Sequence, residues 1–135
     1  MKILLCLDYS SFTKEVLATA KSFVESLKTA ELSVLHVIDK QLFFATTGYE
    51  TQLSEDLQRE SEELKRLCVQ YLGLNVKYIE EYGIPNLEID ETIEQTEYDL
   101  LIIGNHGRHG LGERLLGSTA EHLLRHSKKP VLIIP

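Results

Sequence analysis

Short apolar runs recur along the chain, and segments with helical periodicity separate them. The runs cover residues 3–7, 32–38, 74–79, 100–103 and 131–134. Continuous runs of Ile, Leu and Val are typical of strands that are buried on both faces of a parallel sheet. Apolar stripes with a 3.6-residue period lie between them and predict a crossover helix after each of the first four strands. The predicted order is βαβαβαβαβ.

Local signals bound the predicted helices. The turn at residues 9–11 is expected to supply the N-cap of the first helix, and Gly73 is expected to end the second. Pro85 suits the first turn of the third helix, and the fourth is expected over residues 118–126. Right-handed crossovers place helices on both faces of the sheet. A chain of 135 residues is then expected to form one α/β domain, residues 1–135, with a doubly wound five-stranded parallel sheet.

Glycines gather after the fourth predicted strand. Five of the chain's eight glycines lie there: Gly104, Gly107, Gly110, Gly112 and Gly117. Glycine lets a backbone approach a ligand closely, and a loop that leads into a helix N-terminus suits phosphate. The alternative is a surface loop with no ligand.

The charge along the chain is uneven. The segment 104–129 has a net charge of +3, within a chain of net charge −7. This division favours a small phosphorylated ligand over nucleic acid, because long-range repulsion penalises a polyanion more.

Two common phosphate loops do not fit this segment. The stretch 112–119 has the outline of a P-loop, but Ser118 stands where the lysine belongs. The dinucleotide pattern G-x-G-x-x-G is also absent, because Leu115 occupies its third glycine position. We therefore expect neither a fast P-loop nucleotide hydrolase nor a Rossmann dehydrogenase.

The loop resembles a family signature. Gly104, Gly107 and the pair Gly117-Ser118 match the G-2x-G-9x-G-[S/T] spacing of the universal stress protein family. The flanking blocks are similar to that family as well, over the whole chain: residues 3–10, 35–39, 83–85, 98–104 and 129–134. Tyr9, Gly110 and Gly112 depart from the family pattern at the expected mouth of the pocket.

The resemblance implies a strand order of 3-2-1-4-5 and a site for ATP, or for AMP or ADP, with Mg²⁺ at the phosphates. In this chain Asp8 would contact the adenine or ribose end, and Val37 would contact adenine through its backbone. Glycines of the loop would close over ribose and phosphates, which the N-terminus of the last helix would bind. The full expected nucleotide site is Asp8, Val37, Gly104, Gly107, Arg108, Gly117, Ser118 and Thr119.

The same resemblance implies a homodimer in which the last strand, residues 131–134, pairs with its copy. An uncovered apolar edge strand favours such pairing.

Other reactive side chains receive simpler interpretations. The pairs His106/His109 and His122/His126 have no acidic or cysteine ligand at metal-binding spacing, so no side-chain metal site is expected. His36 is expected in the core or in the pocket wall. Cys6 is expected to pack in the core, because nothing basic nearby would activate its thiol.

The function expected from these observations is a nucleotide-binding sensor or switch of the stress response. A slow ATPase or self-phosphorylating enzyme that uses Ser118 is the first alternative, and an interaction protein without ligand is the second. Two cysteines in no paired spacing favour a reducing, cytoplasmic compartment. No apolar stretch approaches the roughly 20 residues that span a bilayer, so no membrane partner is expected.

Overall fold

Helices and strands alternate as expected. A computed structural model describes residues 1–39, 50–105 and 116–135, with only the backbone described for residues 50–54. The elements are β1 (Lys2–Cys6), α1 (Thr13–Glu25), β2 (Glu31–Asp39), α3 (Glu50–Leu72), β3 (Lys77–Gly83), α4 (Pro85–Gln95), β4 (Leu100–Gly104), α5 (Ser118–His126) and β5 (Val131–Ile134). The expected bounds of the last helix and the last strand are confirmed at every residue.

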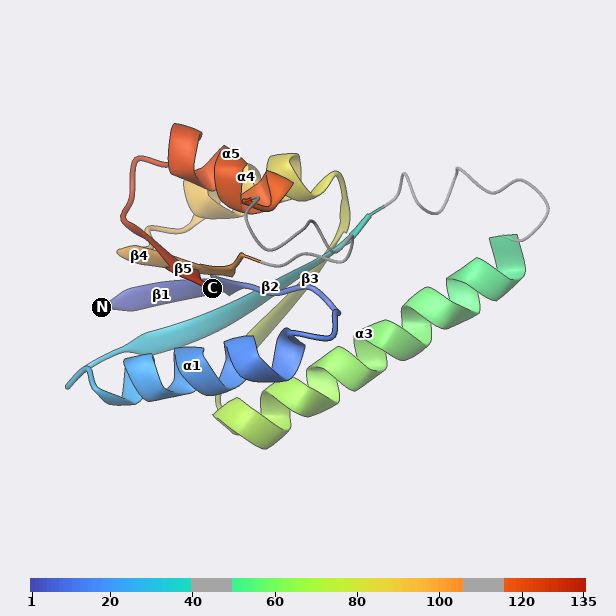
Figure 1. Ribbon diagram of the computed structural model, residues 1–135, viewed down its shortest axis with the longest axis horizontal. Coiled ribbons are helices and arrows are strands. Elements are labelled where there is room, and N and C mark those ends of the chain that lie inside the picture. The colour runs from blue at the N-terminus through green and yellow to red at the C-terminus, as the bar shows by residue number, and fades with distance from the viewer. Residues whose placement is uncertain (40–49, 106–115) are drawn as a thin grey trace.

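The strands form one parallel sheet in the order β3-β2-β1-β4-β5, which confirms the expected order (Figure 1). Leu5 of β1 pairs with Val34 of β2 on one side and with Ile102 of β4 on the other. From β1 to β3 each new strand is added on one side of β1, whereas β4 and β5 are added on its other side. The strand order therefore reverses between β1 and β4. In open α/β sheets ligands bind outside the carboxyl ends of the strands at such a switch point.

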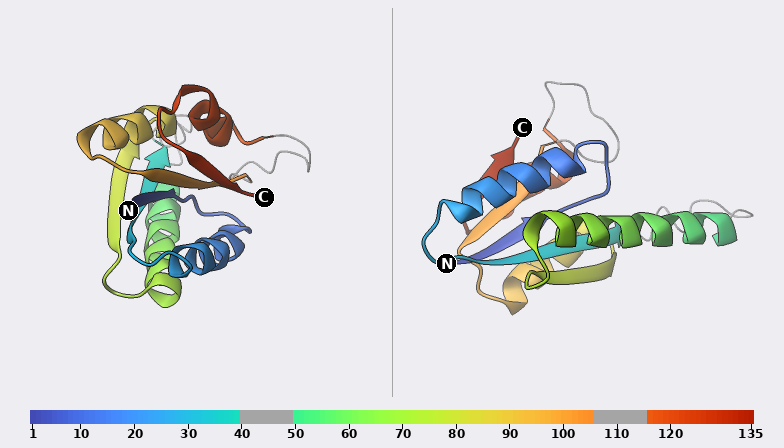
Figure 2. Two further views of the ribbon diagram at one scale, coloured as in Figure 1. Left: turned by 90° about the vertical axis from the view of Figure 1, so that its left-hand side faces the viewer. Right: turned by 90° about the horizontal axis from the view of Figure 1, so that it is seen from below.

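Two pairs of helices cover the sheet. Helices α1 and α3 lie on one face, and α4 and α5 lie on the other (Figures 1 and 2). Alternate residues of β1 serve the two cores, because side chains of a strand point to opposite faces. Leu5 packs with Leu17 of α1, whereas Leu4 packs with Leu123 of α5. Burial on both faces is the reason that β1 is a continuous apolar run.

The third strand differs from the expectation. It was expected at residues 74–79, but it begins at Lys77 and continues to Gly83. Gly73, with φ +91°, ends α3, and Leu74 is 85% exposed in the turn that follows. The strand extends through polar residues because it is an edge strand of the sheet. The apolar pattern therefore marked the wrong part of this segment.

Within residues 1–39, 50–105 and 116–135, no helix combines the length and the apolar character that a bilayer crossing requires.

Candidate functional site

A cavity of about 200 Å³ opens at the carboxyl ends of β1, β2 and β4. Six of the eight expected site residues line it: Asp8, Val37, Gly104, Gly117, Ser118 and Thr119. The other two, Gly107 and Arg108, lie outside the described residues. The fold thus brings the described candidates from β2, β4, α5 and the turn after β1 around one space.

The N-terminus of α5 forms one wall of this cavity. Gly117 is its N-cap residue and supplies no side-chain cap. The first hydrogen bond of the helix runs from the Glu121 N–H to the Gly117 carbonyl oxygen at 2.8 Å. The N–H groups of Ser118, Thr119 and Ala120 precede that bond, so they have no acceptor within the helix, and all three residues line the cavity. Their donors and the helix dipole favour an anion here.

Thr13 fixes the turn that carries Asp8. Its side chain is 2% exposed, and its Oγ1 donates to the Asp8 carbonyl oxygen at 2.9 Å while it accepts from the Ser10 N–H at 2.8 Å. The expected N-cap within residues 9–11 is wrong, because Phe12 is the N-cap residue. The Ser10 hydroxyl instead accepts from the Phe12 N–H at 3.1 Å. Sequence reasoning missed Thr13, whose β-hydroxyl just inside a helix start was the available signal.

Two residues at the end of β4 shape the cavity from the other side. A Cβ at Gly104 would lie 2.9 Å from Cγ2 of Val16, so glycine lets β4 approach α1 closely. Asn105 donates its backbone N–H to the Ile134 carbonyl oxygen at 2.7 Å. Its side-chain Oδ1 is buried and has no hydrogen-bond partner within the described part of the chain. This acceptor, in a residue that lines the cavity, would be satisfied by a ligand hydroxyl or amine.

The end of β2 forms a more polar wall. His36 is 7% exposed and lines the cavity, and the hydroxyl of Tyr78 lies 3.3 Å from its Nδ1. The expectation of a core or pocket-lining histidine is confirmed. Burial, and then the charge of Glu80, raise the pKa of the Tyr78 phenol, so this hydroxyl stays protonated at neutral pH.

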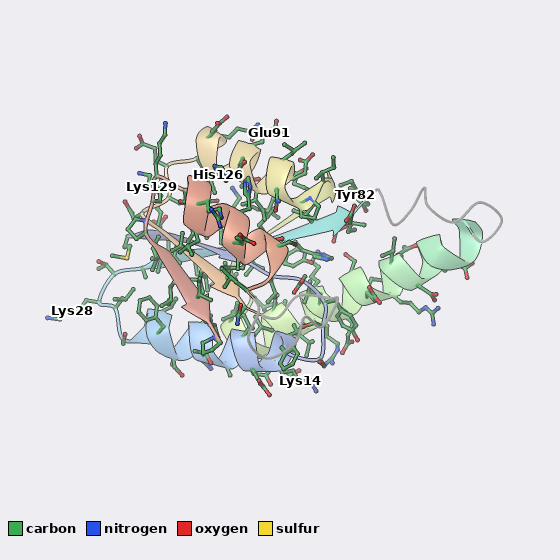
Figure 3. All side chains as sticks on the ribbon, turned by 45° about the horizontal axis from the view of Figure 1, so that its top comes forward. Lys14, Lys28, Tyr82, Glu91, His126 and Lys129 are labelled. Atoms are coloured by element: carbon green, nitrogen blue, oxygen red, sulfur yellow. The ribbon has the colours of Figure 1, made fainter. Side chains whose placement is uncertain are left out.

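Of the five cations in the basic segment 104–129, Arg108 and Arg114 lie outside the described residues, and the other three belong to α5 or follow it. Lys129 lies beyond the C-terminus of α5, at the end of the molecule opposite Tyr82 and the carboxyl ends of the strands (Figure 3). Arg125 is in the last turn of α5 and pairs with Glu121 at 3.0 Å. These cations therefore do not supply the phosphate site, because α5 runs antiparallel to the strands. Its N-terminus, rather than its basic C-terminal turn, faces the cavity.

Cys6 packs in the core as expected, and His122 has an acidic partner that the sequence did not indicate. Burial raises the pKa of the Cys6 thiol to about 12, which makes it a poor nucleophile. His122 Nε2 lies 2.8 Å from Oδ2 of Asp90, and this pair joins α5 to α4. No group of three His, Cys, Asp or Glu side chains suited to a metal occurs among the described residues. His106 and His109 lie outside them.

Comparison with known proteins gives the family. The model of the universal stress protein family matches residues 1–135, and the chain belongs to this family. Universal stress protein MJ0577 of Methanocaldococcus jannaschii is 32% identical, over 98% of this chain and 93% of its own length.

Solved structures agree with this assignment. The structure of MJ0577 has a TM-score of 0.78 at 34% identity and covers 98% of this chain and 94% of its own. Universal stress protein UspA from Lactobacillus plantarum has a TM-score of 0.77 at 26% identity, over 100% of this chain and 97% of its own.

More distant relatives carry nucleotides. An Archaeoglobus fulgidus universal stress protein was solved in complex with dAMP (TM-score 0.56, 16% identity, covering 100% of this chain and 98% of its own). Another universal stress protein was solved with cAMP (TM-score 0.68, 19% identity, covering 99% and 95%). At these identities the likeness to this chain is one of fold.

Proposed function

We propose that this chain binds ATP, or AMP or ADP, in the cavity at the carboxyl ends of its strands. The observation that carries the proposal is the uncapped N-terminus of α5, which presents the N–H groups of residues 118–120 to that cavity. The nucleotide complexes of related universal stress proteins support it. So does the G-2x-G-9x-G-S signature, although Gly107 lies outside the described residues.

The proposed orientation follows the order of the strands. Phosphates lie at Gly117, Ser118 and Thr119, where helix donors favour negative charge. Ribose lies beside Gly104, and Asn105 can accept a hydrogen bond from one of its hydroxyls. Adenine reaches Asp8 and the backbone of Val37 at the end of β2. Gly107, which belongs to the family signature, and Arg108 next to it are the two further residues of the proposed site, and both lie outside the described residues.

Mg²⁺ fits this site only together with the nucleotide. The described residues offer no cluster of side chains for a metal, so phosphate oxygens and water would supply most of its ligands. When bound, Mg²⁺ would neutralise phosphate charge. At the phosphate end of the cavity, the described residues that offer side-chain oxygens are Ser118 and Thr119, through their hydroxyls.

The outer edge of β5 supports a homodimer. β5 is the last strand of the sheet, and its Val131, Leu132 and Ile133 are only partly buried. The contact between His122 and Asp90 shows which side of α5 faces α4. Leu124 follows His122 by two residues, or about 200° around the helix, so its side chain lies on the opposite side, toward the edge formed by β5. Leu124 is 59% exposed. We propose that β5 and Leu124 pair with their copies in a second chain.

In the cell the dimer would act as a cytoplasmic sensor or switch of the stress response, with no nucleic-acid or membrane partner. The two free cysteines, both buried, fit a reducing compartment. Slow ATP turnover or phosphorylation of Ser118 is the second candidate, favoured by the position of this hydroxyl in the cavity wall. Labelled ATP separates the two candidates: turnover above background that Ser118→Ala abolishes would indicate an enzyme.

The direct test is nucleotide release. Gently purified protein is denatured, and the supernatant is analysed for nucleotide by anion-exchange chromatography. The Tm of the refolded or apo protein is then measured with and without ATP. We expect a released adenine nucleotide, a rise in Tm with ATP, or both, because a ligand that binds only the folded state stabilises it. If no nucleotide is released and Tm does not change, the ligand-free interaction protein becomes the better interpretation.

A further inference from the structure

One hydrogen-bond acceptor in the cavity wall has no partner in the described part of the chain. It is the side-chain Oδ1 of Asn105, which is buried. Other polar side chains that line the cavity already interact with groups of the protein, among them those of His36, Asp39 and Glu60. A buried acceptor without a donor is rare in folded proteins, because burial removes the water that would otherwise satisfy it. Asn105 is therefore the described lining residue that most clearly needs a donor from a ligand.

The backbone that carries this side chain is held by the neighbouring strand. Gly104, the last residue of β4, pairs with Ile134 of β5. The Asn105 N–H then donates to the Ile134 carbonyl oxygen at 2.7 Å. Asn105 thus follows a paired strand without a break, which restricts the positions that its short side chain can reach. The acceptor is pre-organised, so a ligand gains from it without having to order the backbone.

Only some parts of a nucleotide can donate to this oxygen. Ionised phosphate oxygens are acceptors, so they cannot satisfy Oδ1. Ribose hydroxyls and the exocyclic amine of adenine can donate. In the proposed orientation the base lies at the end of β2, which β1 separates from β4 in the sheet. Asn105 directly follows β4, beside the ribose at Gly104, so a ribose hydroxyl is the donor that fits this acceptor.

We propose that Asn105 makes the site selective for the sugar: it accepts a hydrogen bond from a ribose hydroxyl and disfavours nucleotides that lack this hydroxyl. A deoxynucleotide would cover Oδ1 without supplying a donor, and a buried acceptor left unpaired costs affinity. The inference rests on the proposed nucleotide function. It goes further because it assigns the discrimination between ribonucleotides and deoxynucleotides to one side chain.

Three monophosphates that differ only in their sugar hydroxyls test this inference: AMP, 2′-deoxy-AMP and 3′-deoxy-AMP. Each is titrated into the full-length protein by calorimetry, with EDTA present so that no metal ion can serve as the partner of Oδ1. We expect at least one deoxy analogue to bind roughly tenfold more weakly than AMP. In Asn105→Ala this ratio is expected to fall to about one, because no acceptor is left to distinguish the sugars. Asn75→Ala is the matched control: Asn75 is exposed, does not line the cavity and should keep the wild-type ratio.

Asn105→Asp separates a direct contact from a structural role. It keeps an acceptor oxygen at the same place, so it should retain the preference for AMP, although its charge lowers the affinity for all three nucleotides. If Asn105 only maintained the shape of the cavity, alanine would weaken the three nucleotides alike and leave their ratio unchanged. The side-chain amide signals of Asn105 in ¹H–¹⁵N spectra give a readout that needs no variant. AMP at saturation is expected to shift them more than the weaker-binding deoxy analogue does.

The outcomes distinguish this inference from the proposed function. If neither AMP nor ATP binds wild-type protein, both fail together. If AMP and the two deoxy analogues bind wild-type protein equally, the inference is wrong and the proposed function stands. An unchanged preference for AMP in Asn105→Ala also overturns the inference, since another group then recognises the sugar. Should Asn105→Ala not fold, side-chain amide signals of Asn105 that respond equally to all three nucleotides overturn it.

Discussion

Gly104 of β4 lies against Val16 of α1, and both residues line the cavity. A methyl group at this position would meet Val16 Cγ2 at 2.9 Å, a distance at which something must shift. We expect Gly104→Ala to lower the free energy of unfolding by about 1–3 kcal/mol, measured by urea denaturation. Adding Val16→Ala makes room for the new methyl group. The double variant should therefore lose less stability than the sum of the single changes, and strict additivity would contradict this explanation.

Cys6 makes the stability of the fold depend on pH in the alkaline range. Its pKa rises from 9.0 to about 12 because burial penalises the thiolate. Above pH 9 the unfolded chain loses this proton while the folded chain keeps it, so stability falls as pH rises toward 12. The expected slope is about 1.4 kcal/mol per pH unit for this one proton. Urea denaturation between pH 8 and 11 should show a shallower fall for Cys6→Ala, and parallel pH profiles would count against the assignment.

Thr13 acts on a whole element, the turn between β1 and α1. Thr13→Val keeps the shape but leaves the Asp8 carbonyl oxygen and the Ser10 N–H without this partner. We expect it to lower the free energy of unfolding by about 1–3 kcal/mol and to weaken nucleotide binding, measured by denaturation and calorimetry. Thr13→Ser keeps the hydroxyl and should retain most of both properties. If Thr13→Val binds and unfolds like wild type, the hydroxyl does not hold the turn.

The elements show what the sequence could predict. β5 and α5 were predicted at their exact bounds because a continuous apolar run and an amphipathic helix have strong local patterns. The bounds of β3 failed because this strand lies at an edge, where pairing with β2 extends it through Glu80 and Glu81. Local hydrophobicity carries no signal of that pairing.

The site was predictable only in part for a similar reason. Asp8, Gly104 and Gly117 are marked by strand ends and by glycine spacing, and the fold brings them together. Asn105 and Glu60 owe their place to tertiary contacts, so no local pattern distinguishes them from other polar residues. For Arg125 and Lys129, proximity to the glycine loop in the sequence did not mean proximity to the cavity, whereas Arg108 and Arg114 lie outside the described residues. Arg125 and Lys129 follow α5 to the other end of the sheet.

At the scale of the whole molecule, the proposed dimer predicts an effect of one exposed leucine. Leu124→Glu places a charge beside the edge of β5, and we expect it to shift the protein toward monomer in sedimentation at micromolar concentration. Leu87→Glu is the matched control, because Leu87 is 60% exposed on α4, away from β5. If both variants sediment as wild type does, or if wild type is itself a monomer, this interface is wrong.

In the proposed complex, the phosphates of the nucleotide lie at the N-terminus of α5. Amide ¹H–¹⁵N spectra of the protein, recorded during titration with ATP and Mg²⁺, test it most directly. The account predicts that the largest shifts fall on the backbone amides of residues 117–120, with smaller shifts at Asp8, Val37 and Asn105. If saturating ATP leaves the amide signals of residues 117–120 unchanged, this placement of the phosphates is wrong, whether or not other amide signals shift.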